Sequence, residues 1–101
     1  MDSKRNGEEL VQIFRVGPYS IYFWSNENNL LEPIHVHIAE GKATANATKV
    51  WITSTGQTIL SHNKSQIPVR TLKKLMRSIE ANSGQIIEKW IEQFGEIRYY
   101  C

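Results

Sequence analysis

The sequence contains a single cysteine, Cys101, so it cannot build an internal disulfide framework. We therefore expect a fold that depends on its core, in a reducing, cytoplasmic setting. No apolar run approaches the roughly 18 residues that a membrane span requires. The polar stretch 1–9 contains no apolar segment of the kind found in secretory signals. These absences argue against a secreted or membrane-embedded protein.

Acidic residues are missing from the middle of the chain. None occurs between Glu40 and Glu80, although this stretch carries seven lysines and arginines. The net charge of only +2 therefore conceals an uneven distribution. An uncompensated basic surface attracts anions, including nucleic acid, so the asymmetry informs us about partners and not about the fold.

Five segments have the alternating or β-branched composition of strands, and turn residues separate them. Gly17-Pro18 breaks the first two apart, and we expect Glu40-Gly41-Lys42 to form a tight hairpin connection. Alanines 43, 45 and 47 share one face of the fourth strand and leave room for a bulky neighbour. The expected strands are 11–16, 19–24, 34–39, 43–52 and a short 58–60.

Helical periodicity replaces this alternation after Pro68, which suits the first turn of a helix. Apolar residues recur at spacings of three and four from Val69 to Ile79 and again from Ile86 to Phe94, and Gly95 is placed to end the second helix. We predict an α+β fold, an antiparallel β-meander of four to five strands followed by a helical hairpin packed on one sheet face. The single domain would cover 11–95, with a flexible extension at 1–10 and a tail at 96–101.

Two of the three histidines stand two residues apart in Pro33-Ile34-His35-Val36-His37-Ile38. Side chains alternate along a strand, so His35 and His37 should share one face and the apolar residues the other. We expect the apolar face to meet the helices, which leaves both rings accessible on the open face. Their ordinary pKa near neutrality suits proton transfer, metal binding or contact with phosphate.

Several roles are compatible with this histidine pair. In a ribonuclease, His35 and His37 would act as general base and acid, Lys64 or Arg70 would stabilise the developing charge, and Glu27 could join them if its loop folds back. A metal site needs three or four ligands, and the pair supplies two, so we expect no metal or cofactor, with these rings as the ligands if one binds. The structural alternative is that the rings only make cross-strand hydrogen bonds.

Four cations stack on one face of the first predicted helix. Arg70, Lys73, Lys74 and Arg77 follow the spacing i, i+3, i+4 and i+7. Because like charges repel, the carboxylates of Glu88 and Glu92 or an acidic partner should offset them. The face is either solvated or a binding surface for phosphates or an acidic protein. No aromatic residue interleaves with these cations, which argues against base stacking there.

Four sequence motifs occur in a recognisable order: Ile13-Phe14-Arg15-Val16-Gly17, Ser25-Asn26-Glu27, Pro33-Ile34-His35-Val36-His37, and a late Trp90 with Phe94-Gly95. Together they resemble a small bacterial family, the domain-of-unknown-function family numbered four-one-six-zero. Its recognisable positions here are Ser25, Glu27, Pro33, His35 and His37. The chain has Glu32-Pro33 where the family often has two prolines.

The resemblance implies a cytoplasmic component of a toxin–antitoxin-like pair, because such genes often lie beside another small domain of unknown function. The protein would bind the neighbouring gene's product or RNA through the basic helix face and the histidine strand, with Ser25, Asn26 and Lys64 contributing. A small ribonuclease using the His-x-His pair is the alternative. A structural module that forms homodimers through an exposed sheet edge is the third interpretation.

Overall fold

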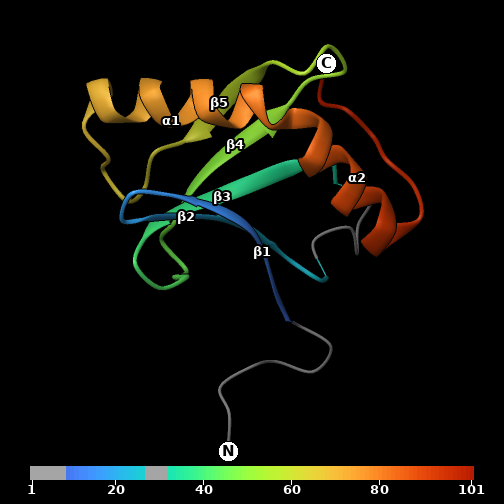
Figure 1. The fold of residues 1–101 in the computed structure, drawn as a ribbon, viewed down its shortest axis with the longest axis horizontal. Helices are drawn as coiled ribbons and strands as arrows, with labels where there is room; N and C mark the ends of the chain where they lie inside the picture. The colour runs from blue at the N-terminus through green and yellow to red at the C-terminus, as the bar shows by residue number, and fades with distance from the viewer. Residues whose placement is uncertain (1–8, 27–31) are drawn as a thin grey trace, which may run out of the picture.

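The computed structural model describes residues 9–26 and 32–101 (Figure 1). One antiparallel sheet with the strand order β1-β2-β3-β4-β5 is followed by two helices, which confirms the predicted α+β meander. Predictions for residues 1–8 and for Glu27 lie outside the described residues. The elements are β1 Leu10–Val16, β2 Tyr19–Trp24, β3 His35–Glu40, β4 Thr48–Ile52, β5 Thr58–His62, α1 Val69–Ala81 and α2 Ser83–Phe94.

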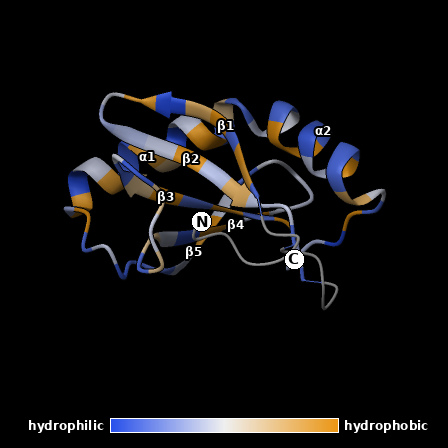
Figure 2. Cartoon of the chain, turned by 90° about the horizontal axis from the view of Figure 1, so that it is seen from below, coloured by the Kyte–Doolittle hydropathy of each residue, from blue (hydrophilic) through white to orange (hydrophobic). Residues whose placement is uncertain are grey.

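The main core lies between the helices and one face of the sheet. Hydrophobic residues, drawn in orange, and hydrophilic residues, drawn in blue, occur together in both helices and in the strands (Figure 2). Ile34, Val36 and Ile38 are fully buried in this core, so the predicted orientation of the histidine strand is confirmed. Each such side chain contributes about 1.5–3 kcal/mol by leaving water. The helical residues that meet the sheet are Leu72, Leu75, Ile79, Ile86 and Trp90.

The connection between β3 and β4 is longer than expected. Residues 41–47 form a loop, and β4 begins at Thr48, so the predictions of a tight hairpin and of a strand over 43–47 are wrong. The loop lies against Tyr22, whose hydroxyl accepts a hydrogen bond from the Thr44 N–H at 3.2 Å. Ala47 is buried with Tyr22 and Ala43 packs against the same cluster, whereas Ala45, which was predicted to share their face, is exposed. The loop therefore covers part of the sheet face that the helices leave open.

The two helices meet at Asn82, the single residue between them. In Figure 1, α2 turns away at an angle from α1 and lies across the end of the sheet. Gly95 ends α2 with a φ of 75°, in the left-handed conformation that glycine adopts without strain. Neither of the two helices described is long and apolar enough to cross a membrane.

Beyond Gly95, residues 96–101 run along the end of the sheet and are tied to it. The Ile34 N–H donates to the Arg98 carbonyl at 2.8 Å, and the Ser54 N–H donates to the Cys101 carbonyl at 3.1 Å. The Tyr100 ring stacks on Trp51, with 5.1 Å between the ring centroids and 5° between their planes. The tail thus delivers an aromatic ring to the open face.

Candidate functional site

A row of polar side chains crosses the open sheet face. Tyr22 pairs with His37 between β2 and β3, His37 with Lys49 between β3 and β4, and Lys49 with His62 between β4 and β5. Residues directly opposite each other in an antiparallel sheet project from the same face. His37, Lys49 and His62 are therefore neighbours on that face, and we call them the His–Lys row.

His35 lies in a different environment from His37. Its side chain is fully buried, and its ring meets Trp51 and Trp90 at centroid distances of 5.6 and 5.3 Å. The ring Nδ1 lies 2.9 Å from the Pro33 carbonyl oxygen and must carry the proton of this bond, because a carbonyl only accepts. The expectation that both rings are accessible is therefore wrong for His35, since Trp90 of α2 covers it at the sheet end.

The two members of the row on β3 and β4 are partly exposed. His37 packs near the Tyr22 ring, at a centroid distance of 5.5 Å. The Lys49 ammonium donates to Glu32 Oε2 at 2.8 Å and lies 4.5 Å from the centroid of the Trp51 ring. The ion pair with Glu32 and the cation–π contact with Trp51 together fix the position of the Lys49 charge beside the His37 imidazole.

His62 completes the row from the end of β5. In the part of the chain that the structure describes, its buried Nδ1 has no hydrogen-bond partner. Burial lowers the pKa of His62 below its ordinary 6.5, and the nearby charges of Lys64, Lys49 and His37 lower this pKa further. The imidazole is therefore mainly uncharged near neutral pH and can accept a proton.

Sequence reasoning considered His62 only as the one further histidine for a metal site and did not place it beside His37. The predicted final strand ended at residue 60, and a bulge between β4 and β5 brings His62 opposite Lys49. The stacking of Tyr100 on Trp51 was not predicted either, because the distance between these residues along the chain gives no sign of it. Alternation along β4 was the one available signal, since it already placed Lys49 and Trp51 together on one face.

A family of known proteins matches the segment of the chain that contains the His–Lys row. The family model for DUF4160, a domain of unknown function, matches residues 19–91. The chain belongs to this family. No curated protein and no solved structure matches it. The DUF4160 match includes all three members of the His–Lys row and Trp51, but not Tyr100.

The predicted binding residues at the end of β2 lie beside the start of β1 in this DUF4160 domain. Ser25 Oγ accepts a hydrogen bond from the Glu9 N–H at 2.8 Å, and the Ser25 N–H donates to the Glu9 carbonyl at the same distance. Asn26 is exposed, and Glu27 lies outside the described residues. Among residues 9–26 and 32–101, no three histidine, cysteine or acidic side chains are grouped so that they could hold a metal ion.

The basic face of α1 lies in the helical layer, on the other side of the sheet from the His–Lys row. Arg70, Lys73, Lys74 and Arg77 are all exposed, and none forms an ion pair with a carboxylate of the described residues. Glu88 and Glu92 therefore do not offset these charges by pairing. The α1 cations and the histidines therefore form two separate surfaces. Lys64, in the loop after β5, lies close enough to His62 for its charge to act on that ring, so it is grouped with the His–Lys row and not with the α1 cations.

Acidification should destabilise the DUF4160 fold through His62. Because the pKa of this group is lowered in the folded state, the unfolded chain binds a proton near pH 6.5 that the folded chain accepts only at lower pH. The free energy of unfolding should therefore fall as the pH decreases below about 6.5. Urea unfolding between pH 8 and pH 5 measures this, and His62→Gln should flatten the decline. An equally steep decline in that variant would contradict the prediction.

Proposed function

We propose that this DUF4160 chain is the RNA-binding component of a toxin–antitoxin-like pair and that single-stranded RNA lies across its open sheet face. The observation that carries the proposal is the His–Lys row next to the exposed Trp51–Tyr100 stack. Cationic groups beside an accessible aromatic ring form the combination that binds single strands without relying on base sequence. The neighbouring gene that the family resemblance implies is the reason for proposing a pair.

Electrostatics favour RNA on this face. Lys49 and Lys64 both lie close enough to His62 to lower its pKa, so positive charge is concentrated at the β4–β5 end of the sheet. The Glu32 carboxylate near them is already paired with Lys49. Phosphates that approach this end therefore meet net positive charge, and their binding would release counterions.

The aromatic pair supplies a platform for a base. Tyr100 is 58% exposed, and its ring is parallel to Trp51, so one ring face is covered and the other is available. The hydrogen bonds of Arg98 and Cys101 to the sheet fix the tail on both sides of this ring. A base that stacks there would therefore order little additional protein, which favours affinity.

Fluorescence anisotropy with a labelled single-stranded RNA tests the proposal. Stacking on an aromatic ring contributes about 1–3 kcal/mol per base, so Tyr100→Ala should raise the Kd about 5- to 150-fold. Lys64→Glu should also weaken binding. The slope of log K against log salt should become shallower by about 0.7 for each phosphate that the variant no longer neutralises.

Lys74→Glu provides the matched control, because it reverses one exposed lysine in the opposite layer. We expect it to leave RNA affinity nearly unchanged, and the α1 cations then remain for an acidic partner protein. If Lys74→Glu weakens binding as much as Lys64→Glu, or if Tyr100→Ala has no effect, RNA does not lie on the open face.

The His–Lys row favours a second function, metal-independent cleavage of the bound RNA. Neighbouring strands lie about 4.8 Å apart, so the Cα atoms of His37 and His62 are about 10 Å apart with Lys49 between them. Rings projecting from these positions can lie on the two sides of one phosphate. In-line displacement at phosphorus requires this arrangement, because the attacking and leaving oxygens are on opposite sides.

The proposed proton transfers give each ring one role. Uncharged His62 would take the proton of the ribose 2′-hydroxyl as that oxygen bonds to phosphorus. His37, as the general acid, would give a proton to the 5′ oxygen as the P–O5′ bond breaks, which leaves a 2′,3′-cyclic phosphate and a 5′-hydroxyl. The Lys49 ammonium would stabilise the negative charge on the phosphoryl oxygens. The proposed catalytic pair is therefore His37 and His62 and not the predicted pair of His35 and His37, because the side chain of His35 is buried.

A further inference from the structure

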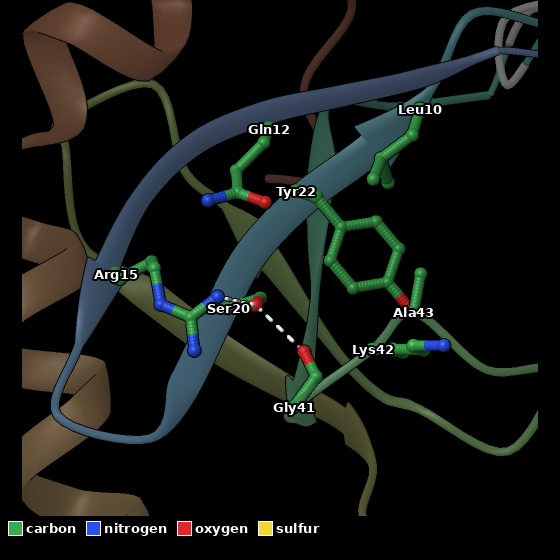
Figure 3. Close-up of a pocket in the computed structure, with 8 residues that line it drawn as sticks. All are labelled: Leu10, Gln12, Arg15, Ser20, Tyr22, Gly41, Lys42 and Ala43. Carbon is green, nitrogen blue, oxygen red and sulfur yellow. Dashed lines mark hydrogen bonds between the residues drawn. The ribbon is translucent and has the colours of Figure 1, made fainter.

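A separate hollow lies on the open face over β1, β2 and the loop that follows β3 (Figure 3). Its volume is about 500 Å³, within the range of pockets that hold small ligands. Polar groups of Gln12, Arg15, Ser20 and Lys42 line it, and Leu10 and Ala43 add apolar surface. None of these residues belongs to the His–Lys row.

The charge in this hollow is positive. Arg15 comes from β1 and Lys42 from the loop after β3, and no carboxylate is among the described residues that line the hollow. Neither cation forms an ion pair with a carboxylate in the described part of the chain. Two unpaired cations from different elements around one concave space favour an anionic ligand.

The guanidinium is positioned by a chain of hydrogen bonds. Arg15 Nη1 donates to Ser20 Oγ at 3.2 Å, and Ser20 Oγ donates to the Gly41 carbonyl at 2.8 Å. The Gly41 N–H donates in turn to the Pro18 carbonyl at 2.8 Å. Ser20 is buried, so the chain is anchored in the sheet, and Figure 3 shows Arg15 and Lys42 on either side of it. Described residues use one of the five guanidinium N–H groups, which leaves others for a ligand.

We propose that this hollow is a binding site for a phosphate monoester. The planar guanidinium of Arg15 can contact two phosphate oxygens at once, and the Lys42 ammonium can approach the same group as a point charge. The volume exceeds that of a phosphate alone, so the remainder of the ligand would lie against Gln12, Leu10 and Ala43. A free nucleotide and the 5′-phosphate end of an RNA strand both present this chemistry.

Calorimetric titration with adenosine 5′-monophosphate, and with adenosine as the comparison, tests the site directly. The monophosphate should bind and adenosine should not. The double variant Arg15→Gln with Lys42→Gln should weaken binding at least about tenfold, because it removes charge-assisted hydrogen bonds. The matched control, Lys73→Gln with Arg77→Gln on α1, removes the same charge and should bind as the wild type does.

A second arm identifies the source of the phosphate. A 5′-phosphorylated RNA and a 5′-hydroxyl RNA of the same sequence are compared by anisotropy. If the site takes the RNA end, the phosphorylated strand binds more tightly and the double variant abolishes the difference. If it takes a free nucleotide, only the monophosphate titration responds to the variant.

The proposal is overturned if the double variant changes neither the titration nor the RNA comparison, or if neither phosphorylated ligand binds better than its unphosphorylated counterpart. Circular dichroism checks that both variants fold. Tyr100→Ala tests RNA binding independently at the other end of the face. If the phosphate site is refuted, the proposal that RNA binds the open face still stands. If Tyr100→Ala refutes RNA binding on the open face, the phosphate site still stands.

Discussion

His62→Ala should lower the rate of the proposed cleavage of single-stranded RNA by about 10²–10⁴-fold, the usual contribution of a positioned general base. The wild-type protein should cleave without added metal and should leave cyclic phosphate ends. His37→Ala should cause a loss of similar size, because the leaving oxygen then receives no proton from the ring. Binding of the RNA should change much less, since the cations and the aromatic stack remain.

The pH profile separates a chemical role from a structural one. Wild-type cleavage should depend on pH as a bell-shaped curve that reports a base and an acid, and His62→Ala should remove the acidic limb, which reports the base. Lys74→Ala, on the opposite layer, is the matched control and should cleave at the wild-type rate. RNA that is bound but never cleaved by the wild type, or wild-type cleavage by His62→Ala, would refute the second function alone.

Trp90→Ala should reduce the free energy of unfolding by about 3–5 kcal/mol. Trp90 is fully buried, and its ring contacts Phe94 and Phe23 at centroid distances of 4.5 and 5.0 Å and also covers His35. Removing it leaves a cavity between α2 and the end of the sheet. Because a small domain has about 5–15 kcal/mol of stability in total, this variant should lose a large part of its stability.

Urea unfolding of the wild type and of two variants measures this effect. Ile91→Ala is the control on the same helix, because Ile91 is 43% exposed and should cost less than about 1 kcal/mol. The Trp90→Ala variant should also expose His35, which hydrogen exchange or chemical modification of the ring detects. A decrease below about 1 kcal/mol for Trp90→Ala would contradict the packing described above.

Local patterns predicted much of this fold. The alternation of Ile34, Val36 and Ile38 indicated which face of β3 meets the helices, and apolar spacing predicted both helices. Gly95 marked the end of α2 because a left-handed residue there releases the chain from the helix. These features depend on neighbours within a few residues, so the sequence carries them directly.

Long-range features were not accessible in the same way. The burial of His35 depends on Trp90, which approaches it across the end of the sheet. The row of His37, Lys49 and His62 depends on a bulge that shifts the β4–β5 register. Strand composition does not encode a bulge, and the stacking of Tyr100 needs the path of the tail. The candidate site therefore became visible only when the register was known.

The opposite placement of the α1 cations and the His–Lys row has a consequence for how a pair of proteins would operate. A partner seated on α1 would leave the sheet surface uncovered, so protein and nucleic acid would form a ternary complex and would not displace one another. To block RNA binding on the open face, such a partner would have to extend around the β1 or β5 edge of the sheet.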